Sequence, residues 1–190
     1  MTKRGRAGRE PDDLRRFSAA AFLAVLLLCA PAFASDMGVT SRQFLSNLGY
    51  ACSKVERGIS SASINSSFRK TNTGCAVEYD SSIIIVINEN VDGNIRNLAV
   101  TYAPDAEEPN KRYMKGGPPP TEVVFAGICM QVMFALHRDM AQKRARAVLN
   151  DIGLYGRAID GVQRSERVGD YNYIMKMQPS GLLVMAVSHI

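Results

Sequence analysis

The sequence predicts an α+β domain in which an antiparallel sheet packs on two main helices. Three observations support this class. First, apolar residues follow helical spacing over 44–55 and again over 121–150. Second, short branched apolar runs joined by turn signals lie between these two stretches. Third, the chain ends on a run in which apolar and polar residues alternate. The order of helix then strands occurs twice, which suggests a tandem duplication of an α-β-β(-β) unit with halves 35–103 and 121–190.

Residues 1–34 are typical of a cleavable signal peptide. Six basic residues precede or flank the start of a 12-residue apolar run from Ala19, and the small-x-small triplet 32–34 follows it. The run is short for a bilayer core of about 30 Å, so a retained anchor is the less favoured alternative. A lipoprotein site at Cys29 is also disfavoured, because Leu28 before it is bulky. We therefore expect a periplasmic or secreted protein.

The charge of the remaining chain excludes one class of partner. Removing residues 1–34 takes away six basic and three acidic residues, so the formal net charge falls from +5 to +2. Residues 35–190 are then a nearly neutral exported domain, which is not typical of a nucleic-acid-binding protein.

The first half begins with a helix and continues with strands. Thr40 and Gln43 have capping-box spacing, and the apolar residues after them fall at helical positions. Strands are expected over 67–71, 75–79, 83–87 and 95–102. The five consecutive branched residues of 83–87 predict a strand buried on both faces.

A break and a second helix follow. Residues 104–120 hold five of the eight prolines and are expected to be a linker or a long surface loop. Thr121 then begins a helix in which Gln131 is the only polar residue over 123–136. That stretch is shorter than the roughly 20 residues of a membrane span, so it predicts a buried core helix and no transmembrane segment after residue 34. The pattern stays helical to about Leu149 or Ile152, with a break as an alternative.

The chain ends on a predicted hairpin. Tyr171, Tyr173, Met175 and Met177 recur at every second position, which places them on one face of a strand. The turn residues 179–181 and a nearly continuous apolar run over 182–187 complete the hairpin.

Three cysteines remain after residue 34. Cys52 and Cys75 lie in polar surroundings, and we expect them to form a disulfide in an oxidising compartment. Cys129 lies in the apolar helix and is expected to be a buried thiol. The cysteine and histidine spacings do not match a metal site, so neither a metal nor a cofactor is predicted.

Catalytic chemistry finds little support. The only histidines are His137 and His189, and Cys129 would lie about 12 Å from His137 along a continuous helix, too far for a direct hydrogen bond. We therefore expect a protein that is not an enzyme. A hydrolase or redox enzyme without a known motif is the least favoured of three functional hypotheses, after the two given next.

The favoured hypothesis is an exported binding or protein-interaction module with an unidentified partner protein or envelope component. The small-ligand or lipid carrier, with an apolar pocket between sheet and helix, is the alternative. The predicted interaction surface combines the two tyrosines of the final hairpin with a group of basic residues that could meet an anionic partner. The polar side of an amphipathic helix is the simpler interpretation of the basic group. The predicted interaction surface consists of Tyr171, Tyr173, Arg138, Lys143, Arg144 and Arg146.

Overall fold

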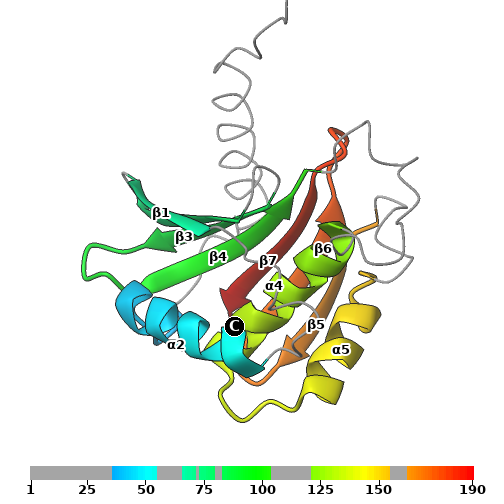
Figure 1. Cartoon of the computed structure of the whole chain (residues 1–190), viewed down its shortest axis with the longest axis horizontal. Coiled ribbons are helices and arrows are strands. Elements are labelled where there is room, and N and C mark those ends of the chain that lie inside the picture. Colours follow the sequence, from blue (N-terminus) through cyan, green and yellow to red (C-terminus); the bar gives the residue numbers. More distant parts are fainter. Residues whose placement is uncertain (1–35, 55–65, 72, 80–82, 104–120, 155–161) are drawn as a thin grey trace, which may run out of the picture.

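The computed structural model describes residues 36–54, 66–71, 73–79, 83–103, 121–154 and 162–190. The predicted signal peptide and the whole proline-rich segment 104–120 lie outside these residues. The described residues form seven strands and three helices, which confirms the α+β class (Figure 1). In chain order the elements are α2 (Ser41–Lys54), β1 (Ser66–Thr71), β2 (Gly74–Tyr79), β3 (Ile83–Glu89), β4 (Ile95–Tyr102), α4 (Thr121–Leu136), α5 (Gln142–Asp151), β5 (Arg164–Val168), β6 (Tyr171–Met177) and β7 (Leu183–His189).

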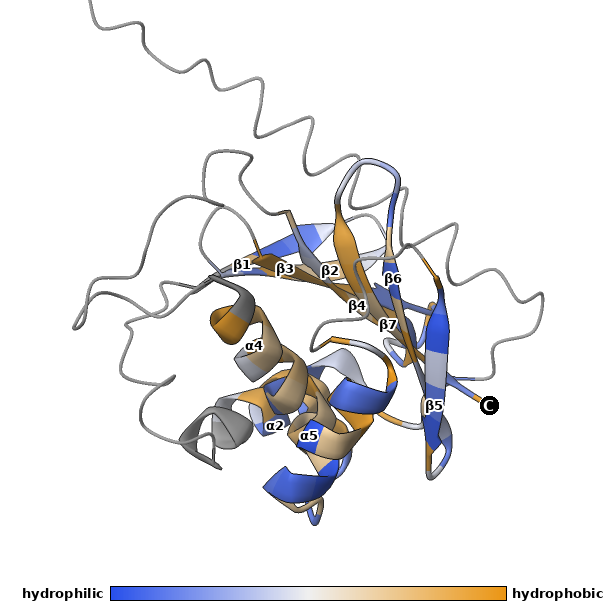
Figure 2. Cartoon of the chain, turned by 90° about the vertical axis from the view of Figure 1, so that its right-hand side faces the viewer, coloured by the Kyte–Doolittle hydropathy of each residue, from blue (hydrophilic) through white to orange (hydrophobic). Residues whose placement is uncertain are grey.

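All seven strands belong to one antiparallel sheet. Their order is β1-β2-β3-β4-β7-β6-β5. The strands β1 to β4 form one meander and β5 to β7 form a second, and the last strands of the two, β4 and β7, pair with each other inside the sheet. The helices lie on one side of this sheet (Figure 2). The order of helix then meander thus occurs twice, while the tandem duplication itself stays a prediction.

The helix α2 begins where the capping pattern places it. The backbone N–H of Gln43 donates to Oγ1 of Thr40 at 3.2 Å, which satisfies one of the N–H groups left free in a first turn. Phe44 and Leu48 face inward and are buried. The segment before α2 is also fixed, because the N–H of Met37 donates to the carbonyl of Ile95 at 2.7 Å.

The helix α4 is the centre of the core. It is apolar on nearly every side because it packs against the sheet, α2 and α5, and helices of this kind are buried. Phe125 contacts Tyr102 on β4 with a ring separation of 5.5 Å. Among the described residues, no helix is long and apolar enough to span a membrane.

The prediction for 83–87 is confirmed. Ile83, Ile85 and Ile87 pack into the main core, while Val86 lies on the opposite face of β3 with 3% of its surface exposed. Val86 belongs to a smaller apolar cluster on the face away from the helices, with Ala99, Leu182 and Val184.

Two features differ from the sequence expectations. The second predicted helix has the break that was given as the alternative: residues 137–141 divide it into α4 and α5, so three helices rather than two cover the described sheet. The strand β5 was not predicted, because its sequence is mostly charged and polar. Such a strand is typical of a sheet edge, where charges oppose further pairing.

The final hairpin forms as predicted. β6 and β7 pair from Tyr171 with His189 to Met177 with Leu183. The N–H of Gly181 donates to the carbonyl of Gln178 at 2.9 Å to close the turn. Gly181 has a φ of +83°, a conformation that other residues rarely adopt.

Candidate functional site

The corner between α4 and α5 gathers most of the polar residues singled out in the sequence. We call residues 137–141 the α4–α5 corner. Its backbone is fixed, because the N–H of His137 donates to the carbonyl of Met133 at 2.8 Å and the N–H of Met140 donates to the carbonyl of His137 at 3.1 Å. Ala141 is extended and precedes the first turn of α5. The corner forms because the apolar run of α4 ends at Leu136 and polar residues follow.

The basic surface, which we define as Arg138, Lys143, Arg144 and Arg146, is exposed along this corner and α5. Two of its members are held by other elements. The guanidinium of Arg138 donates to Oδ1 of Asn47 on α2, and that of Arg144 forms an ion pair with Glu166 on β5 at 3.4 Å.

Lys143 and Arg146 lie on the outer side of α5. They are three residues apart, which places them on neighbouring turns of one helix face. Ala145, Val148 and Leu149 form the inner side of α5 and are fully buried. The two outer cations are therefore directed away from the core.

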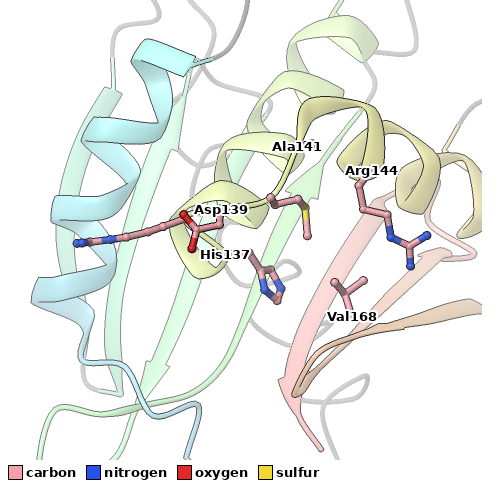
Figure 3. A pocket seen from close by; sticks show the side chains of 7 residues that line it. His137, Asp139, Ala141, Arg144 and Val168 are labelled. Carbon is pink, nitrogen blue, oxygen red and sulfur yellow. The ribbon is translucent and has the colours of Figure 1, made fainter.

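An open hollow of about 450 Å³ lies beside the corner. Figure 3 shows the side chains of His137 and Arg144 directed from the corner and α5 toward β5, where Val168 lies. The hollow has both charged and apolar walls. Its lining residues are His137, Arg138, Asp139, Met140, Ala141, Arg144 and Val168.

An aromatic cluster of His137, Tyr171, Tyr173 and His189 lies beneath the corner. The ring of His137 meets the ring of Tyr171 edge to face at 5.1 Å and lies 6.0 Å from that of Tyr173. Tyr171 also contacts His189 on β7 at 6.0 Å. The cluster joins the end of α4 to two strands of the sheet.

The tyrosines are not placed as an exposed binding surface. Tyr173 is fully buried and Tyr171 is half-buried, so the surface prediction is wrong for Tyr173. The alternating pattern correctly groups them on one face of β6, but that face packs against the helices. The hydroxyl of Tyr171 donates to the carbonyl of Met37 at 3.0 Å, which ties β6 to the segment before α2.

Two buried polar atoms of the cluster lack partners. Nε2 of His137 and the hydroxyl of Tyr173 have no hydrogen-bond partner in the described part of the chain. Burial lowers the pKa of His137, and the nearby carboxylate of Asp170 opposes this shift without reversing it. Burial raises the pKa of both tyrosines. At neutral pH the side chains of His137, Tyr171 and Tyr173 are therefore uncharged.

Cys75 lies in different surroundings from those expected, whereas Cys129 is the buried thiol that was predicted. Cys75 faces the core as a free, buried thiol, and burial, assisted by the charge of Glu89, raises its pKa to about 11. The side chain of Cys52 lies outside the described residues, and the predicted Cys52–Cys75 disulfide is not seen, because Cys75 is a free thiol. Cys129 is a free thiol that is completely buried in α4, and burial raises its pKa well above the usual value.

The exposed cations of the basic surface are suited to binding a negatively charged group. Among the described residues, no three histidine, cysteine, aspartate or glutamate side chains gather as metal ligands. The two described thiols are buried and protonated, which makes them poor nucleophiles. The corner and α5 together present to solvent the four cations of the basic surface, on a fixed backbone.

Sequence reasoning found the basic surface but gave no role to His137, Asn47 or Asp170. Asn47 anchors Arg138 and also donates from Nδ2 to the carbonyl of Ala135 at 3.0 Å. These contacts join residues about 90 positions apart, and no local pattern in the sequence signals them.

Comparison with models of protein families, with curated proteins and with solved structures found no match for this chain.

Proposed function

We propose that this protein is an exported, non-enzymatic binding module that contacts an anionic partner through the basic surface. The partner would be an acidic protein or an anionic envelope component. Export is inferred from residues 1–34, which lie outside the described part of the chain.

The observation that carries this proposal is the composition of the start of α5. Its first turn has no acidic residue, and Ala141 supplies no side-chain cap. Lys143 and Arg144 lie there instead, at the positive end of the helix dipole, and Arg146 follows at the start of the second turn. Cations at this end cost stability, by about 0.3–1 kcal/mol each in typical measurements. A binding role for the cations explains why they are tolerated.

The fixed position of the corner adds support. Arg138 is tied to α2 and Arg144 to β5, so the surface does not have to be ordered when a partner binds. Residues 35–190 carry a formal charge of only +2, so the positive potential is local rather than general.

The carrier alternative has weaker support. It requires an apolar space between α4 and the sheet, but Phe125, Ile128, Val132 and Met133 on α4 are completely buried within the main core. The hollow described above lies at the corner and has charged walls.

Charge reversal tests the proposal. The tagged full chain would be expressed with its own signal, crosslinked in the native envelope, and its partners quantified by mass spectrometry. The K143E/R146E variant should lose at least tenfold in yield of the principal partner. The R42E/R96E variant changes the net charge equally at exposed sites in α2 and β4, and should retain that yield. Equal yields for the two variants would contradict the proposal.

A further inference from the structure

His137 lies where the α4–α5 corner meets the β5–β6 hairpin. Its ring packs on Tyr171 and Tyr173, and the turn of the hairpin lies close to it on another side. A Cβ built on Gly169 would be 3.6 Å from Cε1 of His137, which is ordinary van der Waals contact. Nε2 is buried without a hydrogen-bond partner.

A neutral imidazole tolerates this position better than a charged one. The neutral ring carries one N–H, and the tautomer protonated on Nδ1 leaves only a lone pair on Nε2. Protonation adds an N–H at Nε2, where no described group accepts it. A buried charged donor without an acceptor is strongly unfavourable, so the charged ring is driven toward water or an acidic group.

We propose that protonation of His137 releases the α4–α5 corner from the β5–β6 hairpin and thereby makes the basic surface responsive to acid. The regulation of partner binding rests on the proposed function above, whereas the release itself does not.

The groups around His137 favour this outcome. From β6, Tyr171 and Tyr173 present neutral rings, and His189 on β7 lies behind Tyr171. The hairpin turn contributes the carboxylate of Asp170, which attracts the imidazolium. Other charged groups nearby, among the described residues, belong to the corner, α5 and β5: Arg138, Asp139, Arg144, Glu166 and Arg167, the last of which donates to the carbonyl of Gly169 at 3.2 Å.

The hollow gives the charged ring a place to move. His137 lines it, so a change of side-chain rotamer can carry the imidazolium from the tyrosines into the open hollow. The attraction of the aromatic rings for a cation opposes this movement. It does not supply the missing hydrogen-bond acceptor at Nε2.

The movement can reach the basic surface through the backbone. The N–H and carbonyl of His137 both hydrogen-bond within the end of α4 and the corner, to Met133 and Met140. Arg138, the next residue, is bonded to Asn47. When the ring leaves Tyr171 and Tyr173, the end of α4 loses its aromatic contacts with β6, and the corner that precedes α5 is freed from the hairpin.

The release is tested on the purified protein by lowering the pH from about 8 to about 5, the range in which histidine titrates. Proton NMR follows the histidine rings, and near-ultraviolet circular dichroism follows the tyrosines. The tyrosine signal of the wild type should change with the same midpoint as the His137 ring, below pH 6.5. An unchanged tyrosine signal, or one that follows the midpoint of His189, would overturn the proposal.

Two matched variants assign the transition. H137F keeps an aromatic ring against the tyrosines without an ionisable nitrogen, and it should abolish the change in tyrosine signal. H189F removes the only other histidine, on another ring contact of Tyr171, and should retain the change. The opposite result would assign the transition to His189 and refute the inference. The NMR measurement on the wild type needs neither variant to fold.

A second measurement separates the inference from the proposed function. Partner yield in the crosslinking experiment should change at least threefold between about pH 7.5 and about pH 5.5 for the wild type, and not for H137F. An optical transition with a pH-independent partner yield would refute the regulation. An optical transition with no partner at either pH would refute the proposed function and leave the release intact.

Discussion

The helix α4 and the α4–α5 corner that follows it lie in two different surroundings. Along its length, Phe125, Ile128 and Val132 are completely buried among apolar side chains. Beyond its last residue, His137 lies against tyrosines, with a buried nitrogen that has no partner, and cations follow at the start of α5. The apolar length is arranged for stability, whereas the corner contains several features that reduce it. Departures of this kind are typical of functional sites.

The largest effect is expected in the apolar region. F125A should reduce the free energy of unfolding by about 3–5 kcal/mol, because it leaves a cavity against Tyr102. V123A, at a position in α4 with 40% of its surface exposed, should change it by less than about 0.5 kcal/mol. Urea unfolding measures both. A loss below about 1 kcal/mol for F125A would show that α4 is not packed as described.

Within the aromatic cluster, two chemically identical substitutions should have different effects. Y171F removes the hydrogen bond to Met37 and should cost about 1 kcal/mol. Y173F removes a buried hydroxyl that has no partner, so it should be neutral or slightly stabilising. Thermal unfolding of the two variants gives the ranking, and the reverse order would contradict the described hydrogen bonds.

The pH dependence of stability should depend on His137. The pKa of His137 is lowered in the folded protein, so the unfolded chain binds the proton more readily. The contribution of the neutral ring is complete above the unfolded pKa of about 6.5 and is lost as the pH falls below it. H137F should therefore gain stability relative to the wild type as the pH is lowered. Parallel urea titrations at several pH values check this, and a constant difference would refute it.

The smallest effect is expected at the basic surface, where stability and binding should change in opposite directions. K143E places an acid in the first turn of α5, where it complements the helix dipole, and should stabilise the fold by about 0.3–1 kcal/mol. The same variant should weaken partner capture. A destabilised K143E protein would remove the argument that the cations are retained for binding.

The apolar region could be predicted from the sequence much better than the corner. Branched runs such as 83–87 and the apolar length of α4 specify buried elements whatever their neighbours are. The alternation in β6 shows which residues share a face, but not whether helices cover that face. This is why the sequence prediction placed Tyr173 on an exposed surface, whereas it is buried. The strand β5 lies at the edge of the sheet and is only partly buried, so its sequence needs no apolar pattern that would reveal it as a strand.

The candidate site was only partly accessible to sequence reasoning. Charged residues after an apolar helix are visible as a pattern, and the four cations of the basic surface are exposed. The role of His137 depends on Tyr171, Gly169 and Asp170, which approach it only because the β5–β6 hairpin folds back beside α4. Contacts between distant segments of this kind are set by tertiary packing.

The most direct test is to locate the binding surface by photo-crosslinking. A benzophenone side chain would be introduced singly at positions 143 and 146 on α5, and at positions 42 and 96 as exposed controls. We predict that one and the same partner is captured in the native envelope from the two α5 positions and from neither control. Capture from positions 42 or 96 with none from α5 would contradict the proposal that the partner binds the basic surface.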